Sequence, residues 1–76
     1  MNNKRRDTLK RAAGLLEAAS GLVSQALDAE QDCLDNMPEN LQDGERYQKM
    51  EAAIDKLDDA VSQIDNAKDS IEEASE

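Results

Sequence analysis

A chain of 76 residues with a net charge of −9 has room for one small domain, and it buries a smaller fraction of its surface than a domain of about 150 residues. Histidine is absent and Cys33 is the only cysteine, so there is neither an internal disulfide nor a set of Cys/His zinc ligands. We therefore expect a non-enzymatic protein with no catalytic residue, cofactor or metal, which needs self-association for stability.

The charge is divided unevenly along the chain. Residues 1–11, called the basic start, have a balance of +4, and the remainder has a balance of −13. In an antiparallel hairpin the basic start would lie beside the acidic end of the chain, and we expect mutual neutralisation there. The acidic residues concerned are Asp65, Asp69, Glu72, Glu73 and Glu76. Direct nucleic-acid binding by the basic start is not expected, because the rest of the chain repels phosphate.

The first expected helix spans about residues 5–35 and has a wide apolar face. Its apolar residues recur at steps of three and four, which is the spacing of a helix face, and alanine recurs at every seventh position. A seam of small residues permits close packing of helices, as in a coiled coil. Since this face is wider than one partner helix covers, we expect it to form an oligomer interface. Its residues are Leu9, Ala12, Leu15, Leu16, Ala19, Leu22, Val23, Ala26 and Leu27.

Three small residues of this helix invite separate interpretation. Gly14 and Gly21 each cost about 1 kcal/mol relative to alanine in a helix interior, and we attribute them to the close approach of another backbone in a bundle. Cys33 falls on the small-residue row, where we expect a buried, unreactive thiol. The alternative is a reactive thiol or an intermolecular disulfide.

The connection at residues 35–44 contains the only proline and predicts a structured turn. Asn36 is expected to end the first helix, because asparagine tolerates the left-handed conformation. Pro38 disfavours helical geometry at Met37. The acidic residues of this turn lack the spacing and the central glycine of an EF-hand calcium loop.

The same connection is expected to close one end of the core. Residues 38–41 predict one short helical turn, with Met37 and Leu41 covering the end of the helix pair. Asp43 is the expected N-cap of the second helix, because its side-chain oxygen can accept a hydrogen bond from the first turn.

The second expected helix spans about residues 44–75 and is amphipathic. Its apolar row is interrupted by Lys68, a row of alanines lies alongside, and its opposite side is acidic. We expect this acidic side to be the outer wall of the oligomer and the partner-binding face. Its residues are Glu51, Asp55, Asp58, Asp59, Asp65 and Asp69.

Together these elements predict an all-α, antiparallel two-helix hairpin, with residues 1–76 forming a single domain. Two or more hairpins would complete the core as a dimer or tetramer, and a four-helix bundle is the simplest such assembly. No apolar run reaches the roughly 18 residues of a membrane span, and the basic start lacks the apolar core of a signal peptide. We therefore expect a soluble, cytoplasmic protein with no membrane partner, and the lone thiol fits a reducing compartment.

Residues 36–74 resemble small uncharacterised acidic helical-hairpin proteins of Gram-positive bacteria and their phages. The segments that carry the resemblance are Pro38-Glu39-Asn40-Leu41-Gln42, Glu45-Arg46-Tyr47 and Met50-Glu51, followed by the rows of alanine and isoleucine. The resemblance implies no catalytic residues. It implies a stoichiometric inhibitor or adaptor of host machinery, located in the host cell cytoplasm if a phage encodes it.

The functional hypothesis is therefore a non-enzymatic protein-binding module that self-associates through its first helix and occupies the surface of a heterologous host protein. One alternative is a structural protein whose role is its own oligomerisation. Another is an acidic mimic of nucleic acid, since carboxylates at three- or four-residue steps fall about 5 to 6 Å apart, on the scale of a phosphate row.

Overall fold

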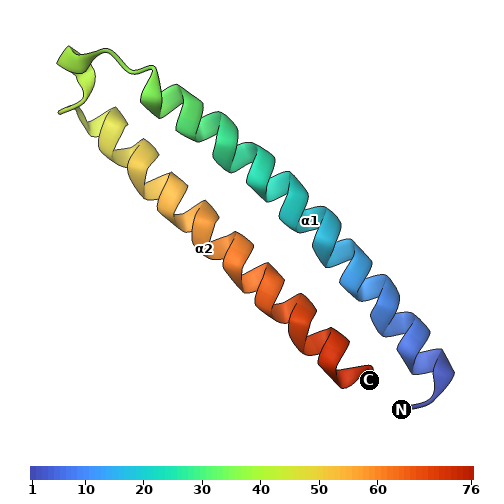
Figure 1. Ribbon diagram of the computed structural model, residues 1–76. Helices are drawn as coiled ribbons and strands as arrows, with labels where there is room; N and C mark the ends of the chain where they lie inside the picture. The colour runs from blue at the N-terminus through green and yellow to red at the C-terminus, as the bar shows by residue number, and fades with distance from the viewer.

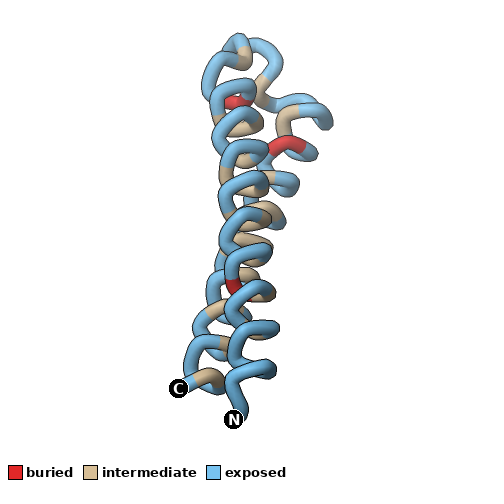
Figure 2. Tube along the Cα trace, turned by 90° about the vertical axis from the view of Figure 1, so that its right-hand side faces the viewer, coloured by how far each residue is buried: buried red, intermediate tan, exposed pale blue.

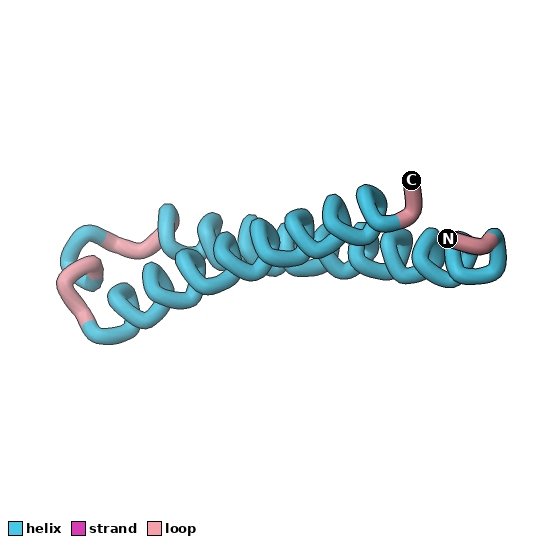
Figure 3. The backbone as a smooth tube through the Cα atoms, turned by 90° about the horizontal axis from the view of Figure 1, so that it is seen from below, coloured by secondary structure: helices cyan, strands magenta, loops and turns pink.

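The computed structural model describes all 76 residues as one antiparallel helical hairpin (Figure 1). Helix α1 spans Asn3–Asp35, a 3-10 helix η1 spans Glu39–Leu41, and α2 spans Glu45–Ala74. The two long helices lie side by side, and both termini lie at the end opposite the connection (Figures 1 and 3). The molecule measures 60 × 14 × 13 Å. The predicted all-α hairpin is confirmed.

Asparagines cap both ends of α1. The side-chain Oδ1 of Asn2 accepts a hydrogen bond of 2.9 Å from the backbone N–H of Arg5, which satisfies one of the free donors of the first turn. Asn36 ends the helix as predicted, and its side-chain amide donates to the carbonyl of Asp32. The expected left-handed conformation was wrong, because Asn36 has φ −93° and ψ 2°.

The connection contains the predicted short helical turn but starts α2 differently. Gly44, not Asp43, is the N-cap, and no side chain caps this end. The reason lies in the preceding turn, where the N–H of Gly44 donates to the carbonyl of Leu41 at 3.1 Å. A Cβ atom at Gly44 would lie 3.2 Å from that same oxygen, so the turn is tight at this residue. Of the two expected end covers, Met37 is half-buried, whereas Leu41 is 50% exposed.

The core is a single seam between α1 and α2. Only Ala13, Leu34 and Met50 are buried; Leu34 and Met50 lie near the connection, and Ala13 lies nearer the termini (Figure 2). Other apolar residues along the seam are half-buried. They are Leu9, Leu16, Val23 and Leu27 from α1, and Tyr47, Ile54, Leu57, Val61, Ile64 and Ile71 from α2.

The surface area shows how open this arrangement is. The accessible surface is 5796 Å² for a mass of 8.4 kDa. A compact monomer of this mass exposes about 4,600 Å², so the hairpin exposes about 1,200 Å² more than the size relation predicts. The excess follows from the elongated shape, in which each helix packs against only one other helix.

Candidate protein-binding surfaces

One side of the seam is marked by polar contacts between the helices. The hydroxyl of Ser20 donates to Oδ1 of Asp65 at 3.0 Å, and Nζ of Lys68 lies 3.8 Å from Oε1 of Glu17. At about 100° per residue, Leu15 and Leu22 lie on the opposite flank of α1 from these contacts. By the same geometry, one row of alanines on α2 lies on the flank of that helix next to Leu15 and Leu22. The row consists of Ala53, Ala60, Ala67 and Ala74.

We call this opposite side the apolar face. Leu15 is 71% exposed and Leu22 is 66% exposed, and they are the two most exposed large hydrophobic side chains of the molecule. Alanines complete the face from both helices, and all of them are exposed or half-buried. The apolar face consists of Ala12, Leu15, Ala19, Leu22 and Ala26 from α1, and Ala53, Ala60, Ala67 and Ala74 from α2.

The structure divides the nine residues predicted as an oligomer interface. Leu9, Leu16, Val23 and Leu27 are half-buried along the seam with α2. The five others belong to the apolar face, Ala12 and Ala19 at its inner edge and the remainder in the open. Only this second group is free to meet another molecule. The α2 half of the apolar face was not part of the predicted interface, although its seven-residue alanine spacing signals it.

Cys33 is exposed, so the prediction of a buried thiol was wrong. The seam of α1 follows the row of Leu16, Val23, Leu27 and Leu34, which leaves the neighbouring alanine row at its edge. Cys33 therefore continues the exposed row of the apolar face beyond Ala26.

The acidic surface is the set of six carboxylates predicted on α2, Glu51, Asp55, Asp58, Asp59, Asp65 and Asp69. All six are exposed, and none forms an ion pair. Asp65 alone has a side-chain hydrogen bond, the one from Ser20. Carboxylates at steps of three and four on a helix repel one another, so the surface is suited to a cationic partner.

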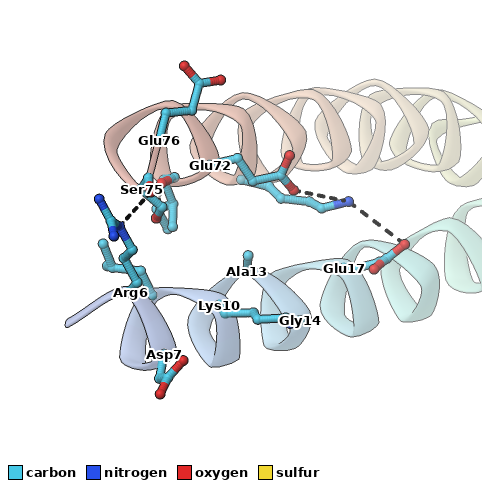
Figure 4. Close-up of a pocket in the computed structure, with 12 residues that line it drawn as sticks. Arg6, Asp7, Lys10, Ala13, Gly14, Glu17, Glu72, Ser75 and Glu76 are labelled. Atoms are coloured by element: carbon cyan, nitrogen blue, oxygen red, sulfur yellow. Dashed lines mark hydrogen bonds and ion pairs between the residues drawn. The ribbon is translucent and has the colours of Figure 1, made fainter. Parts of the chain in front are cut away.

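The two chain ends form an open groove of about 570 Å³ (Figure 4). Within it, Nε of Arg6 donates to the backbone carbonyl of Ser75 at 3.2 Å, and Lys68 bridges Glu17 and Glu72 at 3.8 Å each. Asp7 points away from α2 (Figure 4).

The basic start lies beside the acidic end, as expected, and Arg6 and Lys10 line one groove with Glu72 and Glu76. No residue of the basic start forms an ion pair, and Arg6 instead reaches a free carbonyl at the end of α2. That contact is favourable because a helix C-terminus carries partial negative charge. Mutual neutralisation of the two ends therefore rests on their proximity and not on direct ion pairs.

Comparison of the chain with models of protein families, with curated proteins and with solved structures finds no match. Neither helix is both long and apolar enough to cross a membrane. No group of three or more His, Cys, Asp or Glu side chains is placed to hold a metal ion, and no buried side-chain polar atom lacks a hydrogen-bond partner.

Proposed function

We propose that this protein is a non-enzymatic protein-binding module that self-associates through α1 and presents its acidic surface to a heterologous protein. The observation that carries the proposal is the exposure of Leu15 and Leu22 on a hairpin with only three buried residues. Covering one leucine fully contributes about 1.5 to 3 kcal/mol, so both side chains favour association with another molecule.

The acidic surface supports the second part of the proposal. Its six carboxylates carry no compensating cation, and association with a basic protein would relieve their mutual repulsion. The role that fits is a stoichiometric inhibitor or adaptor that occupies a host protein surface. Origin in a phage or mobile element rests on the sequence resemblance of residues 36–74.

The test is affinity capture from the native host with the purified chain as bait. The variant carries Asp55→Lys, Asp58→Lys and Asp65→Lys, and the matched control carries Asp7→Lys, Glu73→Lys and Glu76→Lys, which are exposed residues outside the acidic surface. Both change the net charge equally. We expect one protein to be captured at fixed stoichiometry, to be lost with the acidic-surface variant, and to be retained with the control.

Two results would redirect the proposal. If the bait recovers only copies of itself, its role is structural assembly. If DNA or RNA competes for the captured protein and binding weakens steeply with salt, the acidic surface acts as a nucleic-acid mimic. Capture that survives charge reversal of the acidic surface contradicts a function for it.

A further inference from the structure

We infer that the apolar face is covered by a second copy of the chain, which lies antiparallel to the first with α1 against α1 and α2 against α2. This inference rests on the self-association in the proposed function, and it adds which face, which orientation and which residues meet. Three independent observations support it: the exposed area, the symmetry of the apolar face and the charge of the two ends.

The exposed area matches what a stable dimer needs. A standard protein interface buries about 800 Å² on each partner. One long face of the hairpin measures about 60 × 14 Å, which is on the order of 800 Å². One copy placed on the apolar face covers Leu15 and Leu22 and leaves the acidic surface in water.

The apolar face is symmetric about one line across the hairpin. Leu15 and Leu22 lie at equal distances from the point between residues 18 and 19, and Ala12 and Ala26 lie at equal distances from Ala19. Ala19 is also the midpoint of α1. A twofold axis at this level places Leu15 of each copy beside Leu22 of the other, which is the reciprocal pairing of an isologous interface.

The alanine row of α2 has its centre at nearly the same level. Ala60 and Ala67, and likewise Ala53 and Ala74, are symmetric about the point between residues 63 and 64. The hydrogen bond between Ser20 and Asp65 places this point close to the level of Ala19. One twofold axis, perpendicular to the helices, therefore places the α1 half of the apolar face on the α1 half of the second copy. The same axis places the α2 half on the α2 half.

Charge favours the antiparallel orientation over a parallel arrangement with both connections at one end. Residues 28–45 contain seven acidic residues and no Lys or Arg, whereas the basic start has a balance of +4 and no ion pair. The terminal end is nearly neutral, because the +4 of the basic start lies beside residues 65–76, where five acidic residues and Lys68 give −4. In the antiparallel dimer each acidic connection end therefore lies over a nearly neutral end of the partner. In the parallel dimer the two acidic connection ends lie together and repel.

Cross-linking distinguishes the two orientations. In the antiparallel dimer the two Cys33 residues are roughly 40 Å apart, at 1.5 Å per residue, whereas residue 19 lies beside its own copy at the axis. The first sample is the wild-type chain treated with a short bis-maleimide, which reaches only nearby thiols. The second is Ala19→Cys in a Cys33→Ser background, oxidised to form a disulfide. Light scattering over a range of concentrations gives the mass of each.

We expect a dimeric mass for both, a cross-linked dimer through residue 19, and no cross-linked dimer through Cys33. Two results overturn the antiparallel arrangement but leave self-association standing. One is a dimeric mass with a cross-link between the two Cys33 residues. The other is a dimeric mass with no disulfide between the two residues at position 19. A monomeric mass at all concentrations overturns self-association itself and with it this inference. Circular dichroism of the Ala19→Cys variant checks that its helical content is that of the wild-type chain.

Discussion

Lys68 of α2 and Glu17 of α1 form the only ion pair that joins the two helices, with Nζ and Oε1 3.8 Å apart. The Lys68 side chain is 28% exposed, whereas that of Glu17 is 73% exposed. The cation therefore occupies a place in the seam that an apolar side chain would otherwise fill, and its partners sit in water.

Replacing Lys68 by leucine is expected to raise the free energy of unfolding by about 1 kcal/mol. Pairs with exposed partners contribute about 0 to 1 kcal/mol, and a largely covered leucine contributes more than that. Urea denaturation followed by circular dichroism, at one fixed protein concentration, measures the change. Gln48→Leu is the control, because Gln48 is exposed on the side of α2 away from the seam and the apolar face, and it should leave stability nearly unchanged. A less stable Lys68→Leu protein would mean that the ion pair outweighs the packing.

Met50→Ala is expected to destabilise the hairpin by about 2 kcal/mol, because it removes one of the two large buried side chains. Leu41→Ala is the comparison, since Leu41 is half exposed and truncating it should cost about 0.5 kcal/mol or less. Both values come from the same urea titration. Equal losses for the two variants would show that the core extends over the connection.

Gly14→Ala and Gly21→Ala are each expected to stabilise α1 by about 0.5 to 1 kcal/mol and to leave the mass in solution unchanged. A Cβ atom at either glycine meets no atom within 4 Å, and both residues lie away from the seam and from the apolar face. Thermal unfolding and light scattering test the two parts separately. A drop in mass would show that another chain approaches the glycine side of α1, as the sequence hypothesis of close backbone packing implies.

Leu15→Glu together with Leu22→Glu is expected to convert the oligomer to monomer, because four carboxylates would meet at one interface. Gln25→Glu together with Ser62→Glu adds the same charge at exposed positions outside the apolar face and should leave the mass unaltered. The readout is light scattering at matched concentrations. Full oligomer mass in the leucine variant would show that the apolar face is not the oligomer interface.

The two helices could be predicted closely from the sequence. Apolar residues recur at steps of three and four over about 30 residues in each arm, and this spacing is typical of a helix. The expected spans of 5–35 and 44–75 compare with Asn3–Asp35 and Glu45–Ala74. The start of α2 was placed one residue early. The hydrogen bond from the N–H of Gly44 to the carbonyl of Leu41 closes a turn that delays the start of α2. The capping preference of Asp43 gives no sign of this turn.

The candidate surfaces could be predicted only in part. On α2 one side is acidic and the other apolar, so the acidic surface followed from the pattern. On α1 several neighbouring rows are apolar, and periodicity does not tell which row meets α2 and which stays open. The seam passes through Leu16 and Leu27, and that choice exposes Leu15, Leu22 and Cys33.

Two of the three buried side chains, Leu34 and Met50, lie near the connection, whereas the far end is held by the Arg6 to Ser75 hydrogen bond and the alanine at position 13. An isolated hairpin should then fray from its termini inward, with amide hydrogen exchange slowing toward the connection. A protein fused to either end of the chain would be tethered to the part of the molecule that opens first.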